Sequence, residues 1–409
     1  MRAPSCRLCG SPLDHVVVDL GMTPLANAFL RYEELGQPET YYPLQALVCD
    51  RCFLVQVQAY EAPEKIFADY AYFSSYSTSW LEHCERYANR MITDLDLDGS
   101  SFVVEVASND GYLLRFFQQR AIGVLGIEPA RNIAAVAEAD GIPTRVEFFG
   151  LELAKELAAQ RQPDLIIGNN VLAHVPDLND FVAGLKEFLS PEGLITIEVP
   201  HLLKLIAEHQ FDTIYHEHFS YFSLVTLKHL FDLHGLRIAD VEELPTHGGS
   251  LRLHVVHSES TRKSSGRLDE LVSRETAAGL LDLATYQAFG MEVQRVKRDM
   301  VRFFVEQKDH GARIGAYGAA AKGNTLLNYC GLGRDFIDFA VDRNPHKQGL
   351  YLPGTHIPIL PPEELEVLRP DLVFILPWNL REEIVQQMSS VRDWNGRLVV
   401  RTPRLTVLT

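Results

Sequence analysis

The segment 211–223, FDTIYHEHFSYFS, gathers two histidines, a glutamate, an aspartate and two tyrosines among three phenylalanines. Histidine titrates near physiological pH, so a histidine beside a carboxylate suits general acid/base chemistry. His216 and His218 would also share one face of a strand. A metal site would then need a third ligand, for which His201 or His174 is available. A satisfied polar network at a domain junction is the third interpretation, and the residue types alone leave all three open.

Two pairs of cysteines have the spacing of a structural zinc site. Cys6-x-x-Cys9 and Cys49-x-x-Cys52 offer four thiolates, which can surround zinc as a tetrahedron. With all four positions filled by protein, the metal would stabilise the fold and take no part in chemistry. A redox pair or unrelated core cysteines are the alternatives.

A second group of polar residues surrounds the turn that follows an apolar strand, SFVVEVASNDG: Glu105, Asn109, Asp110 and Gly111. Glu128 lies 23 residues beyond Glu105, close to where an acidic residue holds the hydroxyls of a ribose. The glycine-rich pattern that accommodates a pyrophosphate is absent, so a cofactor with a ribose and no phosphate fits better. S-adenosylmethionine (SAM) is such a cofactor, and its cationic groups suit the carboxylates. An ordinary strand–turn–helix junction is the alternative.

A third group lies in GAYGAAAKGNT, which offers a glycine turn, a helix start and Lys322. Backbone N–H groups at a helix start favour a phosphate, and a lysine adds positive charge. A dinucleotide site with Asp342 on a ribose is the alternative, although GxxGxxxKG is not the usual fingerprint of such sites.

The bulk composition limits the class of protein that carries these groups. The chain has 409 residues, of which 46% are hydrophobic and 22% charged, so two or three globular domains are expected. A formal charge of −16 argues against nucleic acid or an anionic membrane surface as the partner. No apolar run of about 18 residues is present, and MRAPSCRLCG lacks the apolar run of a secretory signal. A cytoplasmic protein is therefore expected.

The order of the elements predicts where the polar groups meet. Strands and helices alternate from residue 101, which predicts a doubly wound parallel sheet with its ligand at the carboxyl ends of the strands. Residues 261–311 are charged and read as a helical connector. A second, smaller α/β unit follows. The polar groups around Glu105, Glu128 and Lys322 stand at such strand ends.

Taken together, the motifs resemble those of the nucleotide-sugar C-methyltransferases that make branched deoxysugars. The resemblance runs nearly end to end, through CxxC…CxxC, FADYAYFSS, VVEVASNDGYLL, GIEPA, NNVLAHVPD, IYHEHFSYFS, THGGSLR, YGAAAKGN and DRNPHKQG. It implies an α/β protein with three parts. These are a small zinc-binding amino-terminal domain (1–66), a central class I, Rossmann-like, seven-stranded SAM methyltransferase domain (67–245), and a second Rossmann-like α/β domain that helps to bind the nucleotide sugar (246–409).

The resemblance also implies a reaction. A base removes a proton from carbon 3 of a nucleotide-linked 4-keto-deoxysugar, and the resulting enolate takes the methyl group of SAM. His218 is implied as the base, and Glu217 as a residue that orients the imidazole or binds the sugar. Tyr215 would donate to the enolate oxygen or position the ring. His216 falls at a variable position of the family motif and is expected to be dispensable.

Supporting roles are implied for further residues. His174 and a tyrosine of DYAYFSSYS, namely Tyr72 or its neighbours Tyr70 and Tyr76, are expected in the active site. Substrate contacts are expected from His247 and the carboxyl-terminal unit, with Lys347, Trp378 and Asn379 as possible parts of the pocket wall. The expected cofactor contacts are Glu105, Asn109, Asp110, Gly111, Glu128, Pro129 and Asn169, and the other expected substrate contacts are Lys322, Asn324 and Asp342.

The expected partner is the nucleotide-linked ketosugar, with no nucleic acid and no membrane, and the chain is expected to be a monomer or a weak oligomer. Three alternatives to carbon methylation stay open at this point. They are O- or N-methylation of a nucleotide sugar, a non-catalytic nucleotide-sugar-binding protein, and a dehydrogenase that uses the carboxyl-terminal sheet.

Overall fold

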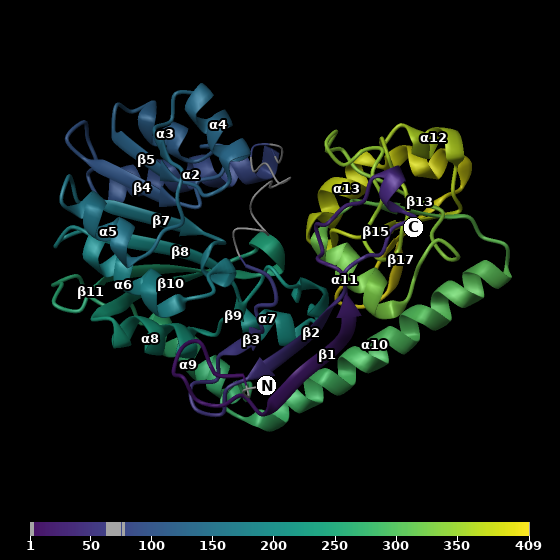
Figure 1. The fold of residues 1–409 in the computed structure, drawn as a ribbon, viewed down its shortest axis with the longest axis horizontal. Helices are drawn as coiled ribbons and strands as arrows, with labels where there is room; N and C mark the ends of the chain where they lie inside the picture. The colour runs from purple at the N-terminus through teal and green to yellow at the C-terminus, as the bar shows by residue number, and fades with distance from the viewer. Residues whose placement is uncertain (1–3, 63–74, 76–77, 409) are drawn as a thin grey trace.

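The computed structural model describes residues 4–62, 75 and 78–408, and this part of the chain is built on three β-sheets (Figure 1). The amino-terminal sheet is antiparallel, in the order β1 (His15–Thr23), β2 (Tyr42–Val48), β3 (Val55–Val57) and β9 (Ser220–Tyr221). Its edge strand β9 belongs to the polar segment 211–223, since Val55 pairs with Tyr221 and Gln56 with Ser220. The amino-terminal part therefore holds one end of that segment.

The middle sheet has seven strands in the order β10-β11-β8-β7-β4-β5-β6. Strands β4 to β8 are parallel, whereas β11 is antiparallel to both of its neighbours. This arrangement confirms the predicted class I fold. The strands are β4 (Phe102–Val106), β5 (Gly123–Ile127), β6 (Thr144–Arg145), β7 (Leu165–Asn169), β8 (Leu194–Pro200), β10 (Leu236–Leu244) and β11 (Ser250–His257).

Helices cover both faces of this sheet, as the alternating sequence pattern predicts (Figure 1). They are α2 (Thr78–Asp94), α3 (Leu114–Gln118), α4 (Arg131–Ala139), α5 (Leu151–Ala158), α6 (Leu178–Phe188), α7 (Leu202–Ala207) and α8 (Leu224–Leu233). The sheet continues past residue 245, where the sequence placed the end of the middle domain, because β11 forms an antiparallel pair with β10.

The carboxyl-terminal sheet has the order β14-β13-β12-β15-β16-β17, in which β17 is antiparallel to β16 and the other pairs are parallel. Its strands are β12 (Ile314–Tyr317), β13 (Phe339–Val341), β14 (Ile359–Leu360), β15 (Leu372–Ile375), β16 (Arg397–Val400) and β17 (Thr406–Leu408). Its helices are α11 (Ala321–Cys330), α12 (Glu364–Leu368) and α13 (Arg381–Gln387).

The predicted helical connector consists of α9 (Arg267–Ala277) and the long helix α10 (Leu283–Asp309), which passes beneath the amino-terminal sheet (Figure 1). Helix α10 packs closely on β1, because a Cβ at Gly290 would lie 2.5 Å from the carbonyl oxygen of Val17. Short 3₁₀ helices complete the described chain at Tyr32–Glu34, Leu172–His174, Phe211–Thr213, Thr246–Gly248, Trp378–Leu380 and Ser389–Trp394.

The amino-terminal part shares its hydrophobic cores with both neighbours. Its cysteine turns, with Leu47 and Leu54, pack in one core with the middle sheet. The other face, with Val17 and Leu44, packs in a second core with α10 and the carboxyl-terminal sheet. The amino-terminal part therefore joins the two larger lobes.

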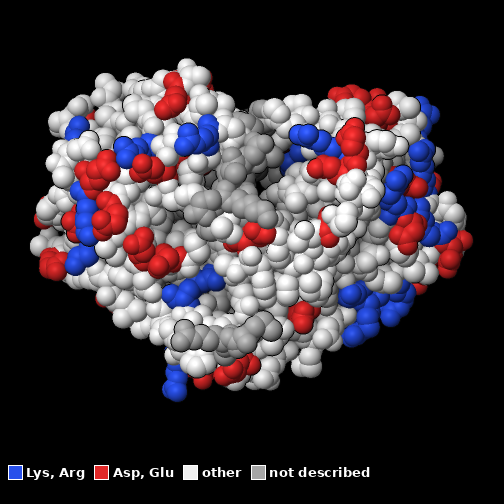
Figure 2. All heavy atoms as spheres, viewed as in Figure 1, with Lys and Arg blue, Asp and Glu red and all other residues white. Residues whose placement is uncertain are grey.

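The visible surface mixes acidic and basic side chains, with Lys and Arg gathered over α10 (Figure 2). The same view shows the molecule hollowed between the two α/β lobes. Among the described residues, no helix combines the length and the apolar character that crossing a membrane requires.

Candidate active site

A cavity of about 1060 Å³ lies between the two α/β lobes. On one side its wall includes Ile127 and Asn169, at the carboxyl ends of β5 and β7. On the other side it includes Tyr317 and Asp342, at the ends of β12 and β13. The amino-terminal part contributes Asn27. Both parallel sheets thus present the edge at which ligands bind in such folds.

The turn after β4 has an unusual backbone. Ala107, Asn109 and Gly111 all have positive φ angles, of 58°, 50° and 74°. At position 111 only glycine fits, because a Cβ would lie 2.8 Å from Cγ1 of Ile142. This backbone turns the N–H of Asn109 toward Glu128, whose Oε2 it reaches at 3.0 Å.

Glu128 is held by the backbone on both of its carboxylate oxygens. Oε2 accepts from Asn109, and Oε1 accepts from the N–H of Ala130 at 2.9 Å. Burial raises the pKa of the Glu128 carboxyl. Asn109, Glu128 and Pro129 line the cavity, as does Asn169, whose buried Oδ1 has no hydrogen-bond partner among the described residues. These residues can hold the ribose and the amino group of a nucleoside cofactor.

Three other predicted cofactor residues lie behind this wall and not on it. Glu105 is fully buried, and burial raises the pKa of its carboxyl well above the usual range. Asp110 accepts hydrogen bonds from the N–H and Oγ of Ser75, at 3.3 and 2.6 Å. Gly111 packs against Ile142. Together they shape the turn, and their contact with a cofactor stays a prediction.

His218 lies on the cavity wall between two hydrogen-bond partners. Its Nδ1 is 2.9 Å from the carbonyl oxygen of Thr213, and its Nε2 is 2.7 Å from the hydroxyl of Tyr215. A carbonyl only accepts, so Nδ1 carries the proton and Nε2 presents its lone pair. Burial, reinforced by His174, lowers the pKa of His218 well below its usual value. The imidazole is therefore neutral, and its Nε2 lone pair accepts a hydrogen bond from the Tyr215 hydroxyl.

His174 stands edge-on to His218, with ring centroids 4.7 Å apart, and both rings line the cavity. It ends the short helix Leu172–His174 that follows β7. Burial lowers the pKa of His174 to about 4, so it is also neutral near pH 7. A neutral imidazole can donate to or accept from a ligand oxygen.

Glu217 extends into the same cavity and meets a residue that the sequence prediction missed. The Nδ2 of Asn27 donates to both carboxylate oxygens, at 2.7 and 2.9 Å. Burial raises the pKa of Glu217 to about 7. No spacing in the sequence relates two residues 190 positions apart, so this contact appears only in the fold.

His216 points away from the cavity, and the metal interpretation of segment 211–223 is wrong. Its Nε2 is 3.2 Å from the carbonyl oxygen of Pro43, and its ring lies edge-on to Tyr42 and Tyr60. His216 and His218 lie in a turn and not in a strand, so they do not share a face. His201 is likewise buried against Glu275, at 2.7 Å.

Lys322 supplies a buried positive charge to the opposite wall. Its Nζ lies 4.8 Å from the centre of the Trp378 ring and donates to Oδ1 of Asn379 at 3.2 Å. Burial lowers the pKa of Lys322 to about 8. Lys347 also lines the cavity, where its Nζ donates to the carbonyl oxygen of Ala319 at 2.8 Å. Two ammonium groups on one wall suit an anionic ligand.

Asp342 follows a strand of the carboxyl-terminal sheet, and backbone N–H groups bind both of its carboxylate oxygens, as they do for Glu128 after the middle sheet. Its Oδ2 accepts from the N–H of Ala319 at 2.6 Å, and its Oδ1 accepts from Asn344 at 2.8 Å. Asn324, predicted to touch the substrate, does not line the described cavity. Its Nδ2 instead donates to the carbonyl oxygen of Ala26 at 2.6 Å.

The predicted residue His247 lines the cavity within an aromatic and amide cluster. Its Nε2 lies 3.2 Å from Nδ2 of Asn170, and its ring meets Trp80 edge-on at 5.4 Å. Trp80 stacks on His83 at 5.0 Å, and both also line the cavity. No sequence pattern pointed to Asn170, Trp80 or His83, because a lone aromatic or amide residue is usually structural. Tyr70, Tyr72 and Tyr76 lie outside the described residues.

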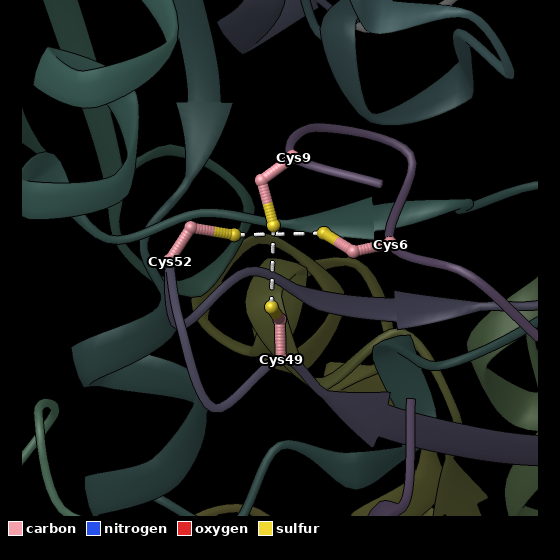
Figure 3. A group of neighbouring side chains, drawn as sticks. All are labelled: Cys6, Cys9, Cys49 and Cys52. Carbon is pink, nitrogen blue, oxygen red and sulfur yellow. Dashed lines mark hydrogen bonds between the residues drawn. The ribbon is translucent and has the colours of Figure 1, made fainter. Parts of the chain in front are cut away.

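The four predicted metal ligands come together away from the cavity (Figure 3). Their Sγ atoms lie within 4.8 Å of one another, with Cys6 and Cys52, and Cys9 and Cys49, 3.5 Å apart. Zinc–sulfur distances of about 2.3 Å imply a tetrahedron with edges of about 3.8 Å, so the four sulfurs fit zinc. Among the described residues no other group of three or more cysteine, histidine or carboxylate ligands forms such a cluster.

Comparison with known protein families finds three matches in chain order. A zinc binding domain matches residues 6–67, a methyltransferase domain matches residues 80–241, and a C-methyltransferase C-terminal domain matches residues 245–403. The protein C-methyltransferase NovU of Streptomyces niveus is 36% identical over 407 residues, which cover 98% of this chain and 96% of that protein. The similarity therefore spans all three parts of the chain.

Solved structures resemble part of the chain at low identity. Magnesium protoporphyrin IX methyltransferase (ChlM) from Synechocystis PCC 6803 is 16% identical, with a TM-score of 0.35, over 44% of this chain and 83% of that one. A SAM dependent methyltransferase from Archaeoglobus fulgidus is 18% identical, with a TM-score of 0.33, over 39% of this chain and 71% of that one. At these TM-scores the likenesses add no argument to the family matches.

Proposed function

Because the chain belongs to the C-methyltransferase family and is a SAM-dependent methyltransferase with a zinc-binding domain, we propose that it methylates carbon 3 of a nucleotide-linked 4-keto-deoxysugar. One observation carries the proposal. A neutral imidazole, His218, presents a basic nitrogen in a cavity that both α/β lobes line. Methylation of a carbon beside a ketone needs such a base, whereas methylation of an amine needs little beyond alignment.

The middle sheet provides the cofactor side of the cavity. When bound, SAM supplies a methyl group on a positively charged sulfur. The Glu128 carboxylate, fixed by two backbone N–H groups, suits the ribose hydroxyls. The buried Oδ1 of Asn169 suits the amino group of the cofactor, which would satisfy an otherwise unpaired acceptor.

The carboxyl-terminal sheet provides the substrate side. The ammonium groups of Lys322 and Lys347 line the cavity and suit the diphosphate of a nucleotide sugar. Asp342 faces the same wall, where its carboxylate is fixed by two backbone N–H groups in the manner of Glu128. This similarity supports a nucleoside on the carboxyl-terminal side and a second, separate nucleoside on the middle sheet.

The chemical step follows from the hydrogen bonds of His218. The Tyr215 hydroxyl gives up its bond to Nε2 of His218, the bond between carbon 3 and its hydrogen breaks with the proton passing to Nε2, and the electron pair forms the enolate. The enolate carbon would then take the methyl group as the bond between that methyl and the sulfur of bound SAM breaks, which leaves neutral S-adenosylhomocysteine. Nδ1–H keeps its bond to Thr213, which steadies the imidazolium that forms. Of the two predicted roles of Tyr215, orientation of the ring is favoured, because its hydroxyl already bonds to Nε2.

The test is incubation of the protein with SAM and a panel of nucleotide-linked 4-ketosugars. A mass gain of one methylene, located on carbon 3 by NMR, is the expected result. A methyl group found on oxygen or nitrogen would refute carbon methylation and support O- or N-methylation of the nucleotide sugar. In that case the His218→Gln variant should keep most of its activity, because neither acceptor needs a base beside the ketone.

A further inference from the structure

The contact between Asn27 and Glu217 is the one place where the amino-terminal part reaches into the described cavity. The Nδ2 of Asn27 donates to both oxygens of Glu217, and both residues line the cavity. Glu217 is 3% exposed, so its carboxylate has little access to bulk water. A buried carboxylate needs such partners to stay ionised and in place.

The segment that carries Asn27 is fixed from the carboxyl-terminal lobe. Asn324 of α11 is 1% exposed and donates to the carbonyl oxygen of Ala26, the residue before Asn27. Three residues beyond Asn27, Leu30 exchanges two backbone hydrogen bonds with Tyr351, at 3.0 and 2.8 Å. The position of Asn27 is therefore set by the lobe that carries Lys322.

We propose that Asn27 is a positioning residue of the substrate site. It fixes the Glu217 carboxylate so that this group accepts a hydrogen bond from a sugar hydroxyl, and Asn324 fixes Asn27 in turn. The inference rests on the proposed function, because it takes the ligand beside Glu217 to be the sugar of a nucleotide sugar. It also explains why Asn324 lies outside the cavity although its motif belongs to the substrate side.

The charged and titratable groups around Glu217 leave the ionisation of its carboxyl dependent on Asn27. Lys347 favours the ionised carboxylate from the carboxyl-terminal lobe, and the neutral ring of His174 contacts the Glu217 backbone. Burial opposes ionisation and brings the pKa of Glu217 to about 7, while the bonds from Asn27 lower it. Removal of Asn27 therefore raises this pKa further, and at neutral pH most of the carboxyl becomes protonated.

The experiment compares Asn27→Ala and Asn27→Asp with the full-length wild-type protein. Hydrogen bonds to a charged group are worth about 1.5–3 kcal/mol, so kcat/KM for the nucleotide ketosugar should fall by about 10- to 100-fold in Asn27→Ala. The acid limb of the pH profile should move to higher pH. Asn27→Asp, nearly isosteric but without the donor, should move the limb further. Asn27→Gln, which keeps the amide on a longer arm, should recover part of the loss.

Two controls separate positioning from general damage. Gln45→Ala removes a single exposed amide–carboxylate bond, Gln45 to Asp19 at 3.2 Å, from the amino-terminal sheet, and should leave kcat/KM unchanged. The KM for SAM and the zinc content should stay at wild-type values in Asn27→Ala. Asn324→Ala should weaken sugar binding in the same direction by a smaller factor.

Each other outcome overturns the inference in a recognisable way. If wild type methylates the ketosugar and Asn27→Ala does so equally well with an unmoved acid limb, Asn27 positions nothing. If the KM for SAM rises as much as the KM for the sugar, the residue supports the fold and not the substrate site. If wild type methylates no nucleotide ketosugar, the proposed function fails, and this inference fails with it.

Discussion

Replacement of His218 by asparagine tests the proposed base with little other change. The carboxamide nitrogen of asparagine falls near the position of Nδ1, so it can keep the bond to the Thr213 carbonyl, which is 2.9 Å from Nδ1. The variant loses Nε2, the nitrogen that would accept the proton. The neighbouring backbone bonds of the turn, such as His218 N–H to the Tyr215 carbonyl, do not involve the ring.

The expected loss of activity is large because His218 is in its unprotonated form at neutral pH. Burial lowers the pKa of His218 well below its usual value, so essentially every wild-type molecule carries the unprotonated base at pH 7. General-base catalysis contributes about 10²- to 10⁴-fold, and kcat should fall by that factor in His218→Asn. Tyr215→Phe keeps the imidazole and removes only its hydroxyl partner, so its loss should be near the value of one hydrogen bond, about 5- to 10-fold.

Two assays separate the base from the methyl transfer. The first follows methyl transfer to a nucleotide ketosugar at saturating SAM. The second replaces SAM by S-adenosylhomocysteine in deuterated water and follows the appearance of deuterium at carbon 3 by NMR, which reports proton abstraction alone. Both rates should fall together in His218→Asn. If deuterium still enters at the wild-type rate, another group is the base and the argument from the Nε2 lone pair is refuted.

Further predictions concern the cofactor wall, the zinc site and the dependence on pH. Glu128→Gln turns an amide N–H toward a backbone N–H, so the KM for SAM should rise by about 10-fold or more while the KM for the sugar changes little. Cys49→Ser should lower both zinc content and melting temperature, whereas Cys84→Ala, outside the cluster, should keep wild-type zinc content. The pH profile of kcat/KM should show an acid limb near pH 7 from Glu217, whose pKa burial raises to about 7, and Glu217→Gln should remove that limb. Burial lowers the pKa values of His174 and His247 to about 4, so the stability they contribute is complete above about pH 6.5 and is lost as pH falls toward 4. The melting temperature of the free protein should therefore fall over that interval.

The sequence predicted the sheets well, because strand and helix periodicity are local properties. The doubly wound sheet, the second α/β sheet and the helical connector follow from such patterns. The cysteine cluster follows from the spacing of the two cysteine pairs, and the class I assignment follows from the family resemblance. Contacts between distant segments were not predictable in the same way. Nothing in the sequence relates Asn27 to Glu217, or Ser75 to Asp110.

The misplaced residues have physical explanations of the same kind. A strand would place His216 and His218 on one face, but the chain turns there, and their rings meet different partners, the carbonyl groups of Pro43 and Thr213. Asn324 follows Lys322 by two residues on helix α11, so it faces another direction from the lysine and meets Ala26. Side-chain direction depends on the local backbone, and composition does not report it.

The amino-terminal part is more than a separate zinc-binding unit, because it packs against both of the other parts. Its cysteine turns share a core with the middle sheet, while its opposite face shares a core with α10 and the carboxyl-terminal sheet. Its strand β3 pairs with β9, which begins two residues after His218, and its Asn27 donates to Glu217, the residue before His218. His218, the proposed base, thus lies between two contacts from the zinc-binding part. Transfer to carbon needs the base, the sugar carbon and the methyl donor in one geometry, although the donor and the nucleotide are proposed to bind to different sheets. A rigid element packed against both sheets can supply that geometry, and zinc, by fixing the turns of this element, would support catalysis without touching a reactant.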